Sequence, residues 1–194
     1  MAKKIALTGG IGSGKSLALD CAKELGYNTV SCDEISRKIY RDKTLKEEIK
    51  KEFGDSVFSS NGRLIRKRLA KLVFGDTGKV AKLNALTHPV IIQKAFKKAS
   101  LSKRDCVIEV PLLFESGLEK EFDQVIVVMR DKNARVNSVV ERDKISKEDV
   151  ENRIKNQFDY AKIDQNAHTL IYNDGTVDEF KVKIGRALDG KKDD

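Results

Sequence analysis

The chain has 194 residues, 40% of them hydrophobic and 35% charged, which suits one compact α/β core with one or two inserted subdomains and excludes wholesale disorder. Its net charge of +8 favours an anionic partner such as nucleic acid, an anionic membrane or a phosphorylated small molecule, although a lysine-rich solvated surface gives the same balance. Aromatic residues make up only 6%, with no Trp, which argues against a stacking platform for single-stranded nucleic acid.

Five short apolar runs predict β-strands. Most are continuous runs of Val, Ile and Leu, as expected for parallel strands that are buried on both faces. Longer stretches with helical periodicity separate them, and this alternation indicates βαβ units in a doubly wound sheet. The predicted strands are Lys4–Thr8, Asn28–Ser31, Cys106–Val110, Gln124–Met129 and Thr169–Tyr172.

The interval from Asp33 to about Leu101 is helical in its periodicity and contains no predicted strand. A crossover between parallel strands needs only about a dozen residues, so this longer interval predicts an inserted helical subdomain. Its expected helical stretches are Ile35–Tyr40, Leu45–Phe53, Leu64–Phe74, Val80–Leu86 and Val90–Ala99.

A second helical region follows the fourth predicted strand. One helix is expected over residues 131–143, and another begins after Ser146, which has Asp149 at the reciprocal capping-box position, and continues to about Lys162. Such a pair could form an extra layer or a mobile lid. The expected organisation is a nucleotide-binding core at 1–33, 102–130 and 163–189, a helical insert at 34–101, a lid at 131–162 and a flexible tail at 190–194.

The cysteines and the N-terminal residues indicate the cellular compartment that we expect for the protein. Cys21, Cys32 and Cys106 are widely spaced without a C-x-x-C pair, which indicates neither a disulfide framework nor a zinc site. Cys21 and Cys106 lie in apolar runs, as core residues do. Reduced thiols, an N-terminus without a signal-peptide-like stretch and the lack of any 18-residue apolar run lead us to expect a cytoplasmic protein without a membrane span.

A phosphate-binding loop follows the first predicted strand. Residues 9–16 read Gly-Gly-Ile-Gly-Ser-Gly-Lys-Ser and match G-x-x-x-x-G-K-[ST]. The loop stands between a strand and an apolar-periodic helix at Leu17–Leu25, which is the context that this motif requires. The glycine spacing does not fit a dinucleotide fingerprint, and a glycine-rich turn without a ligand is the plainer alternative.

The chemistry expected of this loop follows from its backbone. Glycines permit positive φ, so the N–H groups turn inward and form, with the helix N-terminus, a nest for phosphate. We expect the Lys15 ammonium at the β- and γ-phosphates of ATP and the Ser16 hydroxyl at Mg²⁺. The expected ATP-binding residues are Gly10, Ile11, Gly12, Ser13, Gly14, Lys15, Ser16 and Leu17.

Asp33 directly follows the second predicted strand. Ligands of doubly wound sheets collect at the carboxyl ends of the strands, so Asp33 is expected at the same edge as the phosphate loop. A carboxylate there can accept the proton of an acceptor hydroxyl or hold a water on Mg²⁺. From local sequence alone, an N-cap for a helix over residues 34–40 explains Asp33 equally well.

Several segments match one known family in order. They include Ile5–Ser16, Asp33-Glu34-Ile35, His88-Pro89-Val90-Ile91 and the distinctive Val110-Pro111-Leu112-Leu113-Phe114-Glu115. These segments resemble the dephospho-coenzyme A kinases, a family of P-loop kinases, and the resemblance covers nearly the whole chain. Further matches are Phe53-Gly54, Gly62–Arg66, Leu69, Phe74, Arg142, Arg153, Gln157 and Asn173-Asp174-Gly175.

The resemblance implies a three-layer P-loop NTPase core with a five-stranded parallel sheet, a helical acceptor-binding insert and a helical lid. It implies Mg²⁺-dependent transfer of the γ-phosphoryl group of ATP to the ribose 3′-hydroxyl of dephospho-coenzyme A. The implied catalytic residues are Asp33 as the base, Lys15 and Arg142. The implied acceptor-binding residues are Thr8, Asp33, Arg66, His88, Pro111, Leu112 and Leu113, and the implied lid arginines are Arg135, Arg142 and Arg153.

Three positions depart from the usual pattern of the family. Ser31 stands where an Asp is usual, Leu17 replaces a Thr, and Ser138 stands where an Arg is common in the lid. The first two departures should leave the chemistry intact. Arg135 lies on the same predicted helix face as Arg142 and could substitute for the lid arginine that is missing at position 138.

Plainer explanations and rival functions stay open at this point. His88-Pro89 could start a helix, Pro111 could end a strand, and the apolar residues after it could be core. The lid arginines and Arg66 could be solvated charges. The nearest rival is another small-molecule P-loop kinase, such as a nucleoside monophosphate kinase. A nucleotide switch or nucleic-acid-binding NTPase is a rival of another class, although the chain lacks the N-K-x-D motif of regulatory GTPases.

We expect ATP and dephospho-coenzyme A as partners, no nucleic acid, no membrane, and a monomer or small homo-oligomer.

Overall fold

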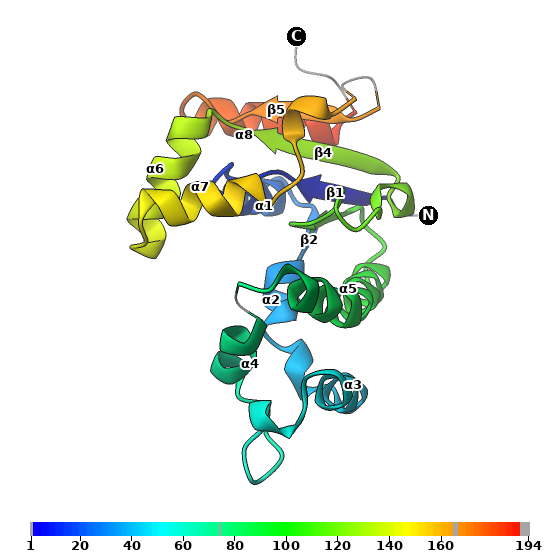
Figure 1. The fold of residues 1–194 in the computed structure, drawn as a ribbon. Helices are drawn as coiled ribbons and strands as arrows, with labels where there is room; N and C mark the ends of the chain where they lie inside the picture. Colours follow the sequence, from blue (N-terminus) through cyan, green and yellow to red (C-terminus); the bar gives the residue numbers. More distant parts are fainter. Residues whose placement is uncertain (1, 74, 165–166, 191–194) are drawn as a thin grey trace. The chain divides into compact units, whose positions relative to one another are not determined.

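The computed structural model describes residues 2–73, 75–164 and 167–190, and the chain divides into two compact units. The helical unit is Cys32–Lys97, and the nucleotide unit is formed by the chain before and after it. Figure 1 shows the parallel strands of the nucleotide unit and the helices of the helical unit. Phe74 lies outside the described residues, as does the predicted tail apart from Gly190.

The nucleotide unit contains a five-stranded parallel sheet in the order β2-β3-β1-β4-β5 (Figure 1). This confirms the predicted α/β fold, and four strands have the predicted bounds. The third ends one residue early, at Glu109, because Pro111 has no N–H with which to continue the ladder. The strands are β1 Lys4–Thr8, β2 Asn28–Ser31, β3 Cys106–Glu109, β4 Gln124–Met129 and β5 Thr169–Tyr172.

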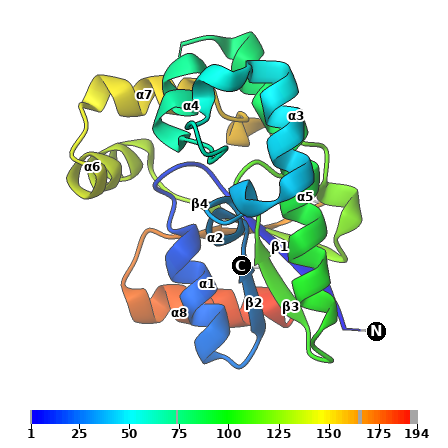
Figure 2. The same cartoon turned by 90° about the horizontal axis from the view of Figure 1, so that it is seen from below.

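Two helices, α1 Lys15–Glu24 and α8 Val177–Leu188, lie side by side against one face of the sheet (Figure 2). Their apolar positions pack with strand residues into one buried cluster, which holds Cys21 and Phe180 among others. All three cysteines are buried thiols outside any disulfide, which confirms the core assignment of Cys21 and Cys106. Burial raises the pKa of the Cys106 thiol to about 11, so this thiol stays protonated at neutral pH.

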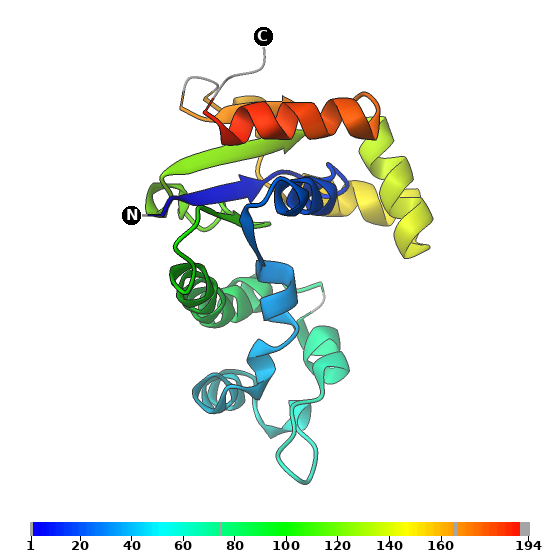
Figure 3. The same ribbon diagram turned by 180° about the vertical axis from the view of Figure 1, so that it is seen from behind.

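Two further helices of this unit, α6 Lys132–Asp143 and α7 Lys147–Lys155, pack together (Figure 3). Ser146 caps α7 as predicted, because its Oγ accepts a hydrogen bond from the Asp149 N–H at 3.1 Å. The predicted extension of this helix to Lys162 is wrong. The apolar residues that α7 packs against α6 end at Ile154, and only a 3₁₀ turn at Tyr160–Lys162 follows.

The helical unit contains mainly short helices and one long one. Its elements are α2 Cys32–Ser36, η1 Ile39–Arg41, α3 Lys43–Phe53, η2 Asp55–Val57, α4 Arg66–Val73 and the greater part of α5 Thr77–Ser100. The predicted break at His88-Pro89 is wrong, because α5 continues through Pro89. Pro89 removes a single backbone donor, and the helical turns on both sides of it are kept. The Thr87 hydroxyl donates to the Leu83 carbonyl at 2.8 Å, a bond that threonine commonly makes inside a helix. The single helix predicted at residues 35–40 is instead α2 followed by η1.

Candidate active site

The phosphate loop joins β1 to α1 and has the backbone that its glycines predict. Gly12 and Gly14 have φ angles of 75° and 104°, a region that favours glycine. Gly12 also lies against α6 so closely that an added Cβ atom would be 2.6 Å from the Arg135 carbonyl oxygen. At this position, a side chain would have to displace helical backbone, and both constraints explain why the loop needs glycine there.

Side chains hold three successive carbonyl groups of the loop. The Ile11 oxygen accepts from Arg135 Nε at 2.9 Å, and the Ser13 oxygen accepts from Asn173 Nδ2 at 2.9 Å. Between them, the Gly12 oxygen accepts from an arginine at the end of β4, Arg130, whose Nη1 lies 3.3 Å away. These donors come from outside the loop, and carbonyl groups bound in this way are kept from turning toward an anion in the nest.

The amides and hydroxyls of the loop differ in their partners. The Ile11 N–H donates to Gln157 Oε1 at 2.8 Å, so in this conformation it is engaged by the segment after α7 and not free for phosphate. The Ser13 hydroxyl is buried and has no hydrogen-bond partner among the described residues. Among the residues expected to bind ATP, the Ile11 N–H is thus held by a distant segment, and the Ser13 N–H donates to the Gly10 carbonyl oxygen within the loop at 3.2 Å.

The start of α1 supplies the lysine, the serine and the first-turn amides. The helix begins at Lys15 after Gly14, whose left-handed conformation ends the loop. Lys15 Nζ donates to the carbonyl oxygens of Gly9, at 2.8 Å, and Gly10, at 3.1 Å, so the ammonium lies over the loop. Ser16 and Leu17 follow in the first turn, where Ser16 is exposed and Leu17 partly buried.

No group of three or more His, Cys, Asp or Glu side chains in the described ranges has the arrangement of a metal site. A single exposed hydroxyl at Ser16 fits a magnesium ion that arrives with the nucleotide, because Mg²⁺ in kinases takes most of its ligands from phosphates and water. The donor set of this chain is therefore compatible with Mg²⁺ as part of the substrate complex.

Two buried hydroxyls lie where β1 meets the loop. Thr8 is fully buried, and neither its hydroxyl nor that of Tyr160 has a well-formed hydrogen bond within the described part of the chain. Burial raises the pKa of Tyr160 to about 12, while the nearby Thr8 hydroxyl acts in the opposite direction. Tyr160 therefore remains a neutral phenol with its proton available for donation. Tyr160 could not be selected from the sequence, because a tyrosine that follows a helix matches no functional motif.

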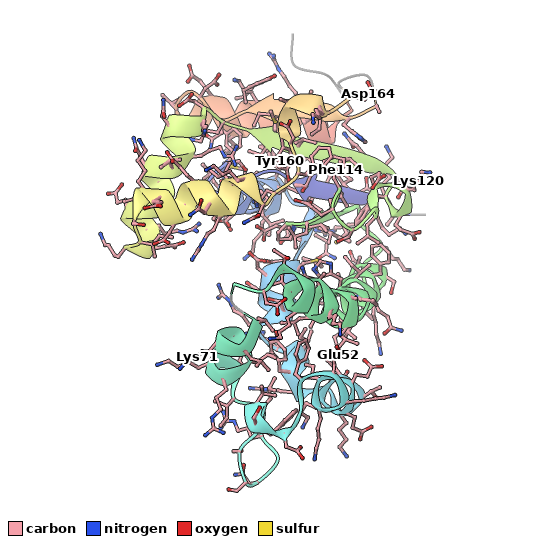
Figure 4. The ribbon with its side chains drawn as sticks, viewed as in Figure 1. Glu52, Lys71, Phe114, Lys120, Tyr160 and Asp164 are labelled. Carbon is pink, nitrogen blue, oxygen red and sulfur yellow. The ribbon has the colours of Figure 1, made fainter. Side chains whose placement is uncertain are left out.

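The Tyr160 ring packs in an aromatic cluster with Phe114 and Phe158. Phe114 stacks on Phe158 with ring centroids 4.8 Å apart, and its ring centroid is 6.1 Å from that of Tyr160 (Figure 4). The Phe158 N–H donates to Glu115 Oε1 at 2.8 Å. The predicted Pro-Leu-Leu-Phe-Glu segment therefore holds the chain that follows α7. Leu113 has no exposed surface and packs in the core, while Pro111 and Leu112 are partly exposed.

Glu109, the last residue of β3, lies at the carboxyl end of the sheet, where the phosphate loop also begins. Glu109 is 4% exposed, is paired in register with Leu7 of β1, and accepts a hydrogen bond from Ser31 Oγ at 2.7 Å. Ser31 is the position where the resemblance leads one to expect an aspartate. Sequence reasoning missed Glu109, although an acidic residue that ends an otherwise apolar strand was a usable signal.

The three arginines expected in the lid have different partners. Arg135 is half-buried on the loop, and burial lowers the pKa of its guanidinium. Arg142 makes two hydrogen bonds to Asp143, at 2.7 and 3.0 Å, and Arg153 lies 3.8 Å from the same carboxylate. Hydrogen bonding from Arg142 lowers the pKa of Asp143. Arg135 is thus hydrogen-bonded to the loop, whereas Arg142 and Arg153 share Asp143 as a partner.

The remaining expected residues belong to the helical unit. Asp33 lies in the first turn of α2, which begins at Cys32 rather than after Asp33, so the simple N-cap explanation does not hold. Arg66 begins α4 with its guanidinium carbon 5.0 Å from the centre of the Tyr40 ring, and His88 lies within α5.

The helical unit also has an open pocket of about 650 Å³, which the sequence did not predict. Its lining combines three lysines with two carboxylates and one aromatic ring, and it includes neither Arg66 nor His88. The lining residues are Lys43, Lys46, Glu47, Lys50, Asp55, Phe58, Ser59, Ser60 and Gly62.

The parallel sheet, the loop between β1 and α1 and the lysine at the start of α1 define a P-loop NTPase. A family model described as dephospho-CoA kinase matches residues 3–179. The dephospho-CoA kinase of Fusobacterium nucleatum is 38% identical over 94% of this chain and 95% of its own. That of Lactobacillus acidophilus is 34% identical over 95% of this chain and 94% of its own. The chain belongs to the dephospho-CoA kinase family and is a kinase.

Solved structures agree with this assignment. The crystal structure of TT1252 from Thermus thermophilus matches with a TM-score of 0.82 at 29% identity, covering 97% of each chain. A dephospho-CoA kinase from Campylobacter jejuni matches with a TM-score of 0.69 at 25% identity, over 97% of this chain and 96% of that one. A shikimate kinase from Acinetobacter baumannii, 18% identical with a TM-score of 0.50, shares the fold alone.

Proposed function

We propose that the chain transfers the γ-phosphoryl group of ATP to the ribose 3′-hydroxyl of dephospho-coenzyme A, giving coenzyme A and ADP, the final step of coenzyme A synthesis. The observation that carries the proposal is the match to the family over residues 3–179, in a chain whose phosphate loop has the required backbone. The alternative is that the chain is another small-molecule P-loop kinase. The similar proteins from Fusobacterium nucleatum and Lactobacillus acidophilus are both dephospho-CoA kinases, which favours the proposed reaction over this alternative.

The nucleotide end of the reaction is assigned to the loop. Its inward N–H groups and the start of α1 would bind the phosphates of ATP, and Lys15 would stabilise the charge on the transferred group. A magnesium ion bound with ATP would supply positive charge beside the phosphates. Ser16 would donate its hydroxyl oxygen to that ion, and Glu109 would hold one of the surrounding waters through its buried carboxylate.

Asp33 would act as the base toward the acceptor hydroxyl. Its support is its place in the chain, two residues beyond the last residue of β2, where a doubly wound sheet collects its ligands. A positioned carboxylate contributes typically about 10²–10⁴-fold to such a proton transfer. Thr8 would act nearby, because its buried hydroxyl lacks a partner among the described residues and can bond to a ligand or water.

The helical unit would bind the acceptor, and the pair of helices α6 and α7 would act as the lid. Arg66 and His88 would bind the acceptor within the predicted insert at 34–101, and the partly exposed Pro111 and Leu112 would contact it from the nucleotide unit. Arg135, Arg142 and Arg153 would close over the phosphates as the lid at 131–162, which excludes water from the transfer.

The setting of the enzyme is also part of the proposal. In the described part of the chain, no helix is long and apolar enough to span a bilayer. We propose a cytoplasmic enzyme that acts on two small anionic substrates, as a monomer or small homo-oligomer, with no role for nucleic acid despite the charge of +8. Retention of DNA on filters across salt concentrations would separate the nucleic-acid alternative.

The direct test is an ADP-release assay with ATP, Mg²⁺ and dephospho-coenzyme A, followed by mass spectrometry of the product. We expect one added phosphate on the ribose 3′ position, and no ADP release when Mg²⁺ is removed with EDTA. ADP release without a phosphorylated acceptor would mean simple ATP hydrolysis and would refute the proposed reaction.

A further inference from the structure

Arg130 has no role in the assignments made so far, although it joins three elements around the phosphate loop. It follows β4 directly and precedes Asp131, the N-cap of α6. Its Nη1 lies 2.9 Å from Ser138 Oγ and 3.3 Å from the Gly12 carbonyl oxygen. This nitrogen carries two protons, so one can go to each acceptor and tie the end of β4 to the loop and to α6.

The partner on α6 is informative because Ser138 stands where the resemblance leads one to expect an arginine. In this chain the position carries only a hydroxyl, and that hydroxyl accepts a hydrogen bond from a guanidinium that comes from β4. The positive charge is therefore present beside residue 138, but a different residue supplies it.

The geometry points to Arg130 as a positioning residue for ATP, which holds the phosphate loop open for phosphate and supplies the charge that position 138 lacks. A carbonyl of Gly12 that turned inward would face the phosphates with a partial negative charge. The bond from Arg130 keeps it outward, and the fixed positive charge behind the loop favours an anion on the other side of the peptide group. Ser138 fixes the direction of the guanidinium.

Two neighbours show what Arg130 adds. Arg135 and Asn173 bond to the carbonyl groups of Ile11 and Ser13 on either side, so loss of Arg130 would free only the middle one of three. Gly12 is also held by its contacts with the Arg135 carbonyl and with Val139. The fold should therefore survive replacement of Arg130, while the loop loses a charge and one fixed carbonyl.

The inference rests on the proposed function only in requiring that the loop binds ATP, so its test measures nucleotide binding without an acceptor. In Arg130→Ala we expect the Kd of ATP to rise about tenfold to a hundredfold, which is the range for losing one hydrogen bond to a charged group. The Kd of adenosine should stay unchanged, because adenosine has no phosphate for the loop to bind. Lys132→Ala, an exposed residue of α6, is the control and should bind ATP like the wild type.

A relocation variant makes the test sharper. Arg130→Ala combined with Ser138→Arg returns the guanidinium to the family's usual position, and it should recover most of the lost ATP affinity. Ser138→Ala alone should weaken ATP binding by about twofold to tenfold, less than Arg130→Ala, because the guanidinium keeps its charge and its bond to the loop and loses only the partner that orients it. Arg130→Lys keeps the charge, but one ammonium on a flexible stem replaces the fixed fork, so an intermediate Kd is expected.

Three results would overturn the inference. The first is an Arg130→Ala variant that binds ATP as tightly as the wild type. The second is an equal loss of ATP and adenosine binding, which would indicate a structural role alone. The third is a relocation variant that stays as weak as Arg130→Ala. Wild-type activity with dephospho-coenzyme A is measured separately, so failure of the proposed reaction would be seen as such.

Discussion

The phosphate loop and the helical unit are built in different ways. Around the loop, side chains from three other parts of the nucleotide unit bond to its carbonyl groups, and the contact at Gly12 leaves no room for a Cβ atom. In the helical unit, the ion pairs Lys82–Glu52 and Lys94–Asp42 lie partly in solvent, and the pocket is open and mixed in charge. Pairs of this kind contribute little to stability, because water and salt screen them.

This difference indicates where the enzyme is preorganised and where it adapts. Transfer of a phosphoryl group depends on donors that are in place before the reaction, and we propose that the loop provides them. A long acceptor can be held by several weaker contacts, which exposed arginines and lysines can supply. Substitutions at the loop should therefore change activity by orders of magnitude, and those on the helical unit should have modest effects on acceptor binding.

The largest effect is expected at Lys15. Lys15→Ala removes the ammonium that lies over the loop, and kcat should fall by about a hundredfold to a thousandfold, the scale for loss of one preorganised donor. The circular dichroism spectrum and the Tm should stay close to those of the wild type. A folded Lys15→Ala protein with wild-type turnover would show that the active site lies elsewhere.

Asp33 is an exception to this comparison. It belongs to the helical unit, but its substitution should lower kcat as strongly as a substitution in the phosphate loop. Asp33→Asn keeps the shape of the side chain but removes the charge, and kcat should fall by about a hundredfold. Thermal stability should change little, since an amide also suits the first turn of a helix. Lost stability with preserved turnover would favour a purely structural role for the carboxylate.

Arg66 tests the helical unit proper. Arg66→Ala should raise the KM of dephospho-coenzyme A about threefold to tenfold while the KM of ATP stays unchanged, as expected when one exposed contact to an anion is lost. The neighbouring exposed Lys67 provides the matched control, and Lys67→Ala should leave both constants unchanged. Equal effects of the two substitutions would mean that only the general charge of this surface matters.

The smallest effect separates stability from catalysis within the nucleotide unit. Thr176 caps α8 in a capping box with Glu179, and Thr176→Ala should cost about 1 kcal/mol, while Thr176→Ser should cost less. For a chain of this size that lowers Tm by about 2–4 °C, with kcat unchanged. Changed kcat in Thr176→Ala would mean that this cap also matters for catalysis.

The capping box also predicts a dependence on pH. Hydrogen bonds from Thr176 lower the pKa of Glu179 below its usual 4.5, so the ionised carboxylate stabilises the fold above that pH. This contribution is lost as the pH falls through the lowered pKa. The Tm difference between Thr176→Ala and the wild type should therefore shrink below about pH 4.5, and a constant difference would contradict the assignment.

The sequence predicted some features well because their signals are local. The five strands are continuous apolar runs, and the loop is a fixed motif, so both could be predicted from neighbouring residues. The continuation of α5 through Pro89 could not be predicted in this way. A helix tolerates an internal proline only when the backbone groups of the neighbouring turns have other hydrogen-bond partners.

The residues that the sequence missed depend on contacts between distant segments. Arg130, Glu109 and Tyr160 are brought to the loop by pairing of strands and by packing of the aromatic cluster. Ser31 and Ser138 looked like losses of charge when the sequence was considered position by position. The structure shows that each hydroxyl is hydrogen-bonded to an ionisable side chain from another element, Glu109 in one case and Arg130 in the other.

The central claim is the choice of acceptor, and competition in a single mixture tests it most directly. Purified protein would be given ATP, Mg²⁺ and equal concentrations of dephospho-coenzyme A, AMP, dTMP, adenosine and shikimate, with initial rates followed by mass spectrometry. We predict that dephospho-coenzyme A is phosphorylated with a kcat/KM at least about a hundredfold above any competitor, about 2.7 kcal/mol of differential transition-state binding. A mixture in which AMP or dTMP is phosphorylated faster would contradict the account, although the chain would still be a P-loop kinase.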